Sequence, residues 1–132
     1  MILLDTHAAI WFTTDSGLGK RSQAIADQAL ADDRLAISAV SFWEISMLVA
    51  KRRLRSLDSA AELREQVLNS GVNEVPLTGD VAILAGDLEG LHGDPADRFI
   101  VATAIAYDAT LVTADTILLK WRNKLRRQDA EK

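Results

Sequence analysis

The sequence predicts an α/β protein in which helices cover both faces of a mostly parallel central sheet of four to five strands. Two observations lead to this fold class. Short segments with strand character alternate along the chain with longer segments of helical spacing. The strand segments are continuous apolar runs, which is typical of strands buried on both faces. We therefore expect a three-layer α/β/α sandwich.

The expected order in the first half is strand 1–5, helix 7–12, loop 15–19, helix 21–30, strand 35–38 and helix 41–53. The two strands are identified by unbroken apolar residues. In the second helix, Ile25, Ala29 and Leu30 recur at helical spacing. The third helix is nearly all apolar apart from Glu44 and its basic end.

The expected order in the second half is a helix from Ser59 to before Gly71, strand 72–77, helix 78–90, turn 91–95, helix 95–108 and strand 110–113. Ser59 and Glu62 form a capping-box pattern, and Pro95 suits a first helical position. In the chain that remains after residue 113 we expect a short helix and then an edge strand at 125–128. Residues from about 120 to 132 form a basic tail, which we expect to be solvated and partly frayed at its end.

Size and composition exclude several classes of protein. The 132 residues predict a single domain over 1–132, with 48% hydrophobic and 26% charged residues. Cysteine is absent and there are two histidines, which excludes thiolate metal sites and a zinc ion held by three histidines. No apolar run approaches the ~18 residues of a membrane span, and the N-terminus lacks a signal-peptide pattern. We expect a cytoplasmic protein without membrane contact.

Acidic residues occur where this fold class binds ligands. Parallel α/β sheets bind ligands beyond the carboxyl ends of their strands, where Asp5 and Asp115 are expected. Glu44 is alone in an apolar helix, where an unpaired carboxylate is costly. Asp97 lies in the first turn of the helix beginning at Pro95. Taken singly, the aspartates could be helix caps and Glu44 could pair with an arginine.

Four gathered carboxylates would require shared protons or a cation. Two unit charges ~4 Å apart repel by roughly 4 kcal/mol at an effective dielectric of 20. A site of oxygen ligands selects hard divalent ions such as Mg²⁺ or Mn²⁺, which are suited to hydrolysis of phosphate esters. Neutralising four acids would change the net charge from −4 to 0. The basic clusters at 51–55 and 120–132 would then be free to face phosphates, although each could also be a solvated helix or chain end.

Three segments, LLDTHAAIWF, ISAVSFWEIS and HGDPADRFIVATAIAYDATLVTAD, resemble the PIN-domain ribonucleases, specifically the VapC-type toxins of bacterial type II toxin–antitoxin systems. The resemblance covers practically the whole chain, in family order. It implies a PIN-like fold and metal-dependent endoribonuclease activity that leaves a 5′-phosphate and a 3′-hydroxyl. It also implies a homodimer and a cognate antitoxin whose C-terminal segment lies in an apolar groove and blocks the acidic pocket.

By this resemblance, Asp5, Glu44, Asp97 and Asp115 are the catalytic residues and bind one or two Mg²⁺ or Mn²⁺ ions. We expect Asp5 and Asp97 to be the primary ligands. Glu44 and Asp115 would complete the coordination, directly or through water, and one of them would orient the attacking water.

Further residues are interpreted around these acids. Thr6 and Thr113 could support a carboxylate or touch phosphate, and Asp94 is interpreted as a helix cap more than a ligand. Arg98 could contact either substrate phosphate or a carboxylate. His7 is expected to have a structural or supporting role rather than to act as a general base, and His92 to lie in a solvated turn.

Six large apolar residues are candidates for the antitoxin groove, some of them in the core and some exposed: Trp11, Phe12, Phe42, Trp43, Met47 and Leu48. Two alternatives to a ribonuclease remain open. Another Mg²⁺-dependent phosphohydrolase with an aspartyl nucleophile would usually have a second acid at position 7, where His7 stands. A non-catalytic interaction module would leave Glu44 unexplained and predicts that Glu44→Gln affects stability at most.

Overall fold

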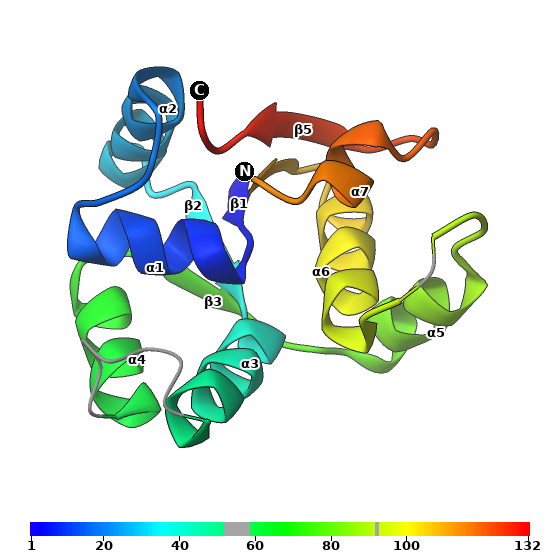
Figure 1. Cartoon of the computed structure of the whole chain (residues 1–132), viewed down its shortest axis with the longest axis horizontal. Coiled ribbons are helices and arrows are strands. Elements are labelled where there is room, and N and C mark those ends of the chain that lie inside the picture. Colours follow the sequence, from blue (N-terminus) through cyan, green and yellow to red (C-terminus); the bar gives the residue numbers. More distant parts are fainter. Residues whose placement is uncertain (52–58, 92) are drawn as a thin grey trace.

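The computed structural model describes residues 1–51, 59–91 and 93–132. Its centre is a five-stranded sheet in the order β3-β2-β1-β4-β5, and every neighbouring pair is parallel (Figure 1). The strands are β1 (Ile2–Leu4), β2 (Leu35–Ser38), β3 (Asn73–Val75), β4 (Thr110–Thr113) and β5 (Arg126–Asp129). The predicted α/β fold with a parallel sheet is confirmed.

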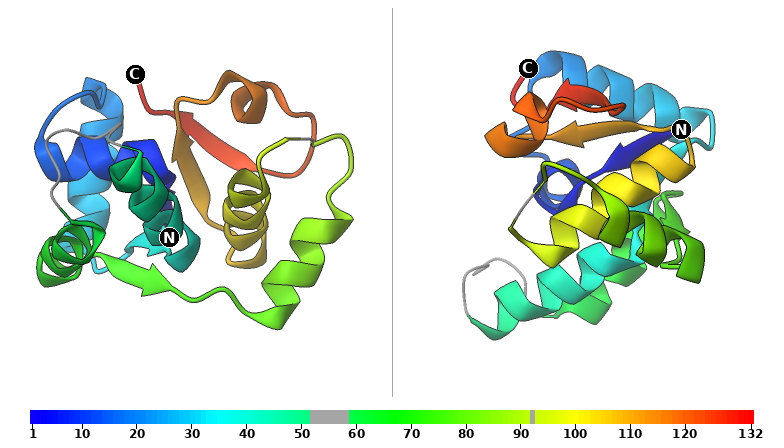
Figure 2. Two further views of the ribbon diagram at one scale, coloured as in Figure 1. Left: turned by 60° about the horizontal axis from the view of Figure 1, so that its bottom comes forward. Right: turned by 90° about the vertical axis from the view of Figure 1, so that its right-hand side faces the viewer.

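Helices lie on both sides of this sheet (Figure 2). They are α1 (Thr6–Thr14), α2 (Lys20–Ala31), α3 (Ala39–Ala50), α4 (Ala60–Asn69), α5 (Gly79–Asp87), α6 (Pro95–Ala106) and α7 (Thr116–Lys120). Within the described parts of the chain, no helix is long and apolar enough to cross a membrane.

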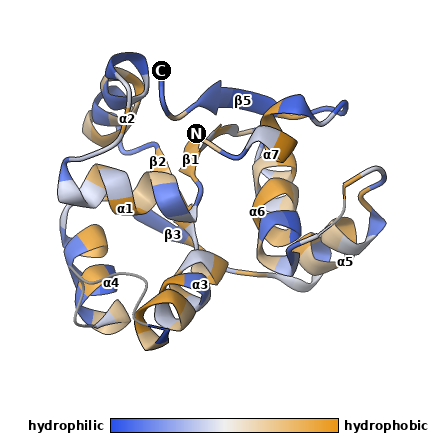
Figure 3. Cartoon of the chain, in the orientation of Figure 1, coloured by the Kyte–Doolittle hydropathy of each residue, from blue (hydrophilic) through white to orange (hydrophobic). Residues whose placement is uncertain are grey.

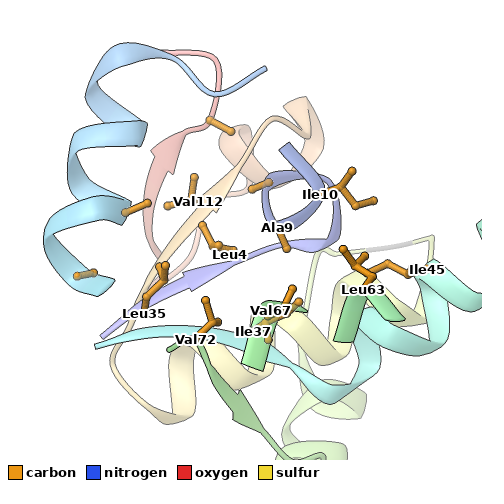
Figure 4. Close-up of a cluster of buried hydrophobic side chains, with 14 residues drawn as sticks. Leu4, Ala9, Ile10, Leu35, Ile37, Ile45, Leu63, Val67, Val72 and Val112 are labelled. Carbon is orange, nitrogen blue, oxygen red and sulfur yellow. The ribbon is translucent and has the colours of Figure 1, made fainter. Parts of the chain in front are cut away.

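Alternating side chains of the strands divide the core into two layers. Leu4, Ile37 and Val112 point to one face and pack against α1, α2, α3 and α4 (Figure 4). Leu3 and Leu111, their chain neighbours, point to the other face and pack against α6 and α7. Because successive strand residues face opposite sides, an unbroken apolar strand requires this double coverage.

Short polar side chains fix where the helices begin. Ser59 Oγ accepts from the Glu62 amide at 3.3 Å, and Thr78 Oγ1 accepts from the Val81 amide at 3.3 Å, as their sequence positions indicated. Ser38 caps α3 directly after β2, so this helix begins two residues earlier than predicted. The basic residues predicted near the end of this helix, Arg52, Arg53 and Arg55, lie outside the described residues. His92 also lies outside them.

The basic C-terminal tail does not fray as expected. It forms β5, one residue later than predicted, and pairs with β4. The Gly19 amide donates to the Ala130 carbonyl at 2.8 Å, and the Arg21 amide donates to the Lys132 carbonyl at 2.8 Å. We call the contacts of residues 126–132 with residues 19–22 and, through Arg127, with residues 118–123 the C-terminal seam.

Candidate metal centre at the carboxyl edge of the sheet

A cleft of about 300 Å³ lies at the carboxyl ends of β1 and β4. Its lining brings together four separate segments of the chain: the start of α1, the middle of α3, the start of α6 and the residues after β4. We call it the acidic cleft, and it is lined by Asp5, Thr6, His7, Trp11, Glu44, Asp94, Asp97, Ala114 and Asp115. All four acids selected from the sequence therefore face one space.

Asp5 and Asp115 each begin the helix that follows a strand. Asp5 Oδ1 accepts from the Ala8 amide at 2.8 Å, and Asp115 Oδ1 accepts from the Ile117 amide at 2.8 Å. Thr113 links the two, because its hydroxyl bonds the Asp5 carboxylate and accepts from the Asp115 amide at 3.1 Å. Since an ionised carboxylate has about four acceptor sites, capping a helix and binding a cation are compatible.

Asp5 is the most buried of these acids, with 8% of its surface exposed. Burial raises the pKa of Asp5 above its usual value, and the nearby Asp115 charge raises it further. The hydrogen bonds from Thr113 and Ala8 and the proximity of His7 act in the opposite direction. The net effect is a carboxylate that is held in place but poorly compensated for its charge.

Glu44 points from α3 into the same cleft. The Thr6 hydroxyl donates to Glu44 Oε1 and also lies 3.0 Å from Ser41 Oγ. Burial raises the pKa of Glu44, as do the charges of Asp94 and Asp5, whereas the bond from Thr6 lowers it. Within residues 1–51, 59–91 and 93–132, no ion pair forms with Glu44, so an arginine partner finds no support.

Asp97 shows the strongest electrostatic strain in the acidic cleft. Burial, followed by the charges of Asp94, Asp115, Glu44 and Asp5, raises the pKa of Asp97 to about 7. A carboxyl group surrounded by like charges takes up a proton or binds a cation. Near neutral pH this position is therefore close to balance between the protonated and the ionised form.

The residues present fit a hard divalent cation, because all the charged groups among them are oxygen donors. In the described parts of the chain, no three acidic or histidine side chains already lie close enough together to hold one ion. Mg²⁺ commonly binds through one or two carboxylates and keeps several waters. The acidic cleft therefore fits an ion held partly through water rather than in a closed cage.

The residues predicted to support the acids take separate positions. Thr6 contacts Glu44 and Thr113 contacts Asp5, as described above. Asp94 lines the acidic cleft, and its Oδ1 also accepts from the Ala96 amide at 2.9 Å, so it caps α6.

Among the described residues, the guanidinium of Arg98 bonds backbone carbonyls and no carboxylate. Its guanidinium donates to the carbonyl of Leu88 at 2.9 Å, to that of Gly86 at 3.3 Å, and to that of Leu91. Arg98 does not line the acidic cleft. Consecutive helix residues point in different directions, so Arg98 turns toward the end of α5 while Asp97 faces the cleft.

The six apolar candidates do not share one surface. Phe12, Phe42 and Leu48 are partly buried against the core. Trp43 and Met47 are exposed, and with Leu48 and Lys51 they line a smaller cleft that shares Glu44 and Asp94 with the acidic one. Trp11 lies inside the acidic cleft itself, one helical turn after His7. The i, i+4 spacing of His7 and Trp11 indicates that the two rings lie on the same face of α1. The sequence analysis did not use this spacing to place Trp11 beside the acids.

The fold and this cleft define a parallel α/β protein with an acidic site at the carboxyl edge of its sheet. Residues 2–123 match the family model of the PIN domain. Ribonuclease VapC22 of Mycobacterium tuberculosis is 36% identical over 124 residues, which cover 92% of each chain. The chain therefore belongs to the PIN-domain family, among its VapC-type ribonucleases.

Solved structures agree with the fold. The DNA-bound VapBC from Salmonella typhimurium aligns with a TM-score of 0.72 at 16% identity, over 98% of both chains. VapBC2 from Rickettsia felis, bound to a DNA fragment from its promoter, aligns with a TM-score of 0.68 at 22% identity, over 97% of this chain and 98% of that one. At these identities the likeness establishes the architecture.

Proposed function

We propose that this chain is a Mg²⁺- or Mn²⁺-dependent endoribonuclease, and that it acts as the toxin of a toxin–antitoxin pair. The observation that carries the proposal is the acidic cleft, where carboxylates from four segments face one another and burial and like charge raise the pKa of Asp97 to about 7. Ribonuclease VapC22, which is 36% identical, supports RNA as the substrate.

When bound, a divalent ion supplies an activated water and a positive charge for the phosphoryl oxygens. Asp5 and Asp97 would hold that ion, and Thr113 fixes the position of Asp5. Asp115, restrained by the amides of α7, would complete the coordination directly or through water. Glu44, held by Thr6, accepts a hydrogen bond from the attacking water and orients it toward phosphorus. The products end in a 5′-phosphate and a 3′-hydroxyl.

The test is cleavage of a structured RNA pool by the purified chain in Mn²⁺ and in EDTA. We expect cutting in Mn²⁺ only, and its loss in Asp5→Asn and in Asp97→Asn. Asp80→Asn, an exposed acid in the first turn of α5, is the matched control and should cut normally. Cutting that persists in EDTA, or in both cleft variants, would contradict the proposal. A folded chain that binds RNA and metal without cutting would be an interaction module instead.

An antitoxin partner is proposed from the surface beside the acidic cleft. The smaller cleft with exposed Trp43 and Met47 continues from the acidic one through Glu44 and Asp94. A segment with apolar side chains followed by a basic one would cover both. Expression of the chain should arrest growth, Asp97→Asn should relieve the arrest, and the cognate antitoxin should restore growth with the unchanged chain. Arrest that persists in Asp97→Asn would contradict a toxic nuclease.

A homodimer is proposed from an apolar surface that adjoins the smaller cleft and shares Trp43 with it. Trp43, Leu77 and Ile83 are exposed, and Trp43 and Leu77 line a pocket of about 250 Å³ with Val40, Pro95 and Phe99. Hydrophobic residues make up much of α3, the helix that carries Trp43 (Figure 3). Light scattering should give twice the 14.4 kDa chain mass, and Ile83→Asp should reduce the mass to one chain. A monomer before any substitution would contradict the proposal.

A further inference from the structure

The acidic cleft has one wall that is not acidic. His7 and Trp11 lie one turn apart on α1, with ring centroids 6.4 Å apart and planes tilted by 58°. Both line the cleft, and the His7 side chain is exposed. We call this pair the aromatic wall. The chemistry proposed for the carboxylates uses neither ring.

The backbone behind the wall fixes the position of Trp11. Gly17 has φ +102°, and a Cβ there would lie 2.7 Å from Trp11 Cγ and 2.8 Å from Cδ2. Only glycine permits this conformation with the backbone so close to the ring. The carbonyl of Trp11 also accepts from the Ser16 amide at 3.0 Å. The backbone at Gly17 therefore packs against the indole and restricts its position. A rigid aromatic ring loses little conformational freedom when a ligand packs on it.

The cleft lining also limits what else could hold a nucleotide there. It contains acids, small residues and these two rings, but no lysine or arginine among the residues that the structure describes. A phosphate can enter such a site only with a cation. Within this described lining, the attractive surface that remains for the rest of a nucleotide is the aromatic wall, which begins two residues after Asp5.

We propose that His7 and Trp11 form a nucleobase subsite, in which a base next to the scissile phosphate stacks on the two rings. This proposal rests on the proposed function and adds a substrate-binding element to it. Aromatic side chains stack with any base and are a common means of holding single-stranded RNA. The subsite would thus favour unpaired nucleotides at the point of cutting.

The test compares two small probes that differ only by a base, adenosine 5′-monophosphate and ribose 5-phosphate. Each is titrated in Mg²⁺ into the full chain, and binding is followed by amide chemical shifts. We expect the nucleotide to bind roughly fivefold or more tightly than the sugar phosphate, from the usual strength of base stacking. His7→Leu and Trp11→Leu should bring this ratio toward one, whereas His7→Phe and Trp11→Phe should retain it.

Two further variants provide a control and an independent test of the Trp11 position. Tyr107→Ala removes an exposed aromatic ring at the far end of α6 and should leave the ratio unchanged. Gly17→Ala pushes on the Trp11 ring and should lower the ratio without weakening ribose 5-phosphate. If Trp11→Leu unfolds, the exposed His7 position carries the test alone.

The outcomes separate this proposal from the proposed function. Equal binding of both probes in Mg²⁺, with neither bound in EDTA, would support the metal site and overturn the nucleobase subsite. A preference for the nucleotide that survives both leucine variants would also overturn it, and the wall would then serve packing or a protein partner. Failure of both probes to bind in Mg²⁺ would count against the cation–phosphate site itself, and with it the subsite.

Discussion

The acidic cleft and the C-terminal seam both join distant parts of the chain, but they treat charge in opposite ways. In the seam, Arg127 donates to the carbonyls of Leu118 and Trp121 at 2.6 Å and of Asn123 at 3.2 Å. In the acidic cleft, carboxylates face one another, and the pKa of Asp97 rises to about 7. In the seam, the charged side chain finds its hydrogen-bond partners within the chain. In the acidic cleft, the repulsion between the carboxylates is relieved by a proton or a cation from solution. This difference separates a structural contact from a site of function.

The largest effect should follow from removing one charge of the acidic cleft. Asp97→Asn removes a group that repels its neighbours, so the free variant should melt at a higher temperature than the unchanged chain in EDTA. It should also lose the stabilisation that Mg²⁺ gives the unchanged chain, since ligand binding to the folded state raises stability by mass action. RNA cutting should fall on the order of a hundredfold or more, above the usual effect of residues that only support a metal ligand.

Thermal melts in EDTA and in Mg²⁺ provide the measurement, with Asp80→Asn as the control that should respond like the unchanged chain. An Asp97→Asn variant that is still stabilised by Mg²⁺ would place the cation elsewhere.

In the seam, steric fit should matter more than charge. A Cβ at Gly19 would lie 2.3 Å from the Lys132 carbonyl carbon, so Gly19→Ala must displace the end of the chain. We expect a loss of about 1–3 kcal/mol in the free energy of unfolding, typical of overpacking. Urea denaturation measures it, and Mg²⁺ binding by the folded variant should not change.

Gly86→Ala is the matched control, because a Cβ there meets nothing within 4 Å and the position is helical. That variant should be neutral or more stable, since alanine is favoured over glycine in helices. Equal losses in the two variants would show that close packing at the seam is not the cause.

A smaller effect is expected from the guanidinium that closes the seam. Arg127→Met keeps the length of the side chain but leaves the three carbonyls without this donor. The expected cost is about 1–2 kcal/mol, measured by urea denaturation, because the side chain is only partly buried and water can replace part of the bonding. Arg34→Met, at an exposed ion pair with Asp32, should show no measurable change. A similar result for both variants would show that Arg127 is as dispensable as a surface charge.

The sequence predicted the fold class from the alternation of strands and helices, and two of the four acids from the ends of strands; Glu44 and Asp97 were selected from their helices and from the resemblance to PIN-domain ribonucleases. Apolar strands that alternate with helices must be parallel and doubly covered, and the carboxyl ends of β1 and β4 then meet at one edge, where Asp5 and Asp115 lie. The direction of Arg98 and Arg127 could not be predicted in this way. Each guanidinium donates to backbone carbonyl oxygens whose positions depend on how a turn folds. Because every residue has a backbone carbonyl, the sequence does not indicate which ones will accept these bonds. The bracing of Trp11 by Gly17 depends on loop geometry in the same way.

A last expected effect is a dependence of stability on pH that comes from the acidic cleft. In the fold the pKa of Asp97 is raised from 3.8 to about 7, so between these values the folded state binds more protons than the unfolded state. Stability must then fall as pH rises from about 4 to 7. Asp5 and Glu44 act in the same direction, because burial raises the pKa of each.

Bound Mg²⁺ should change stability with pH in the opposite direction, because an ionised carboxylate binds Mg²⁺ and a protonated one does not. Melting temperatures in EDTA should therefore decline toward pH 7, and the stabilisation by Mg²⁺ should grow over the same range. Asp97→Asn should flatten both trends, whereas Asp80→Asn should keep both. A decline of equal slope in Asp97→Asn would assign the titration to other groups and remove the electrostatic distinction between the acidic cleft and the seam at this position.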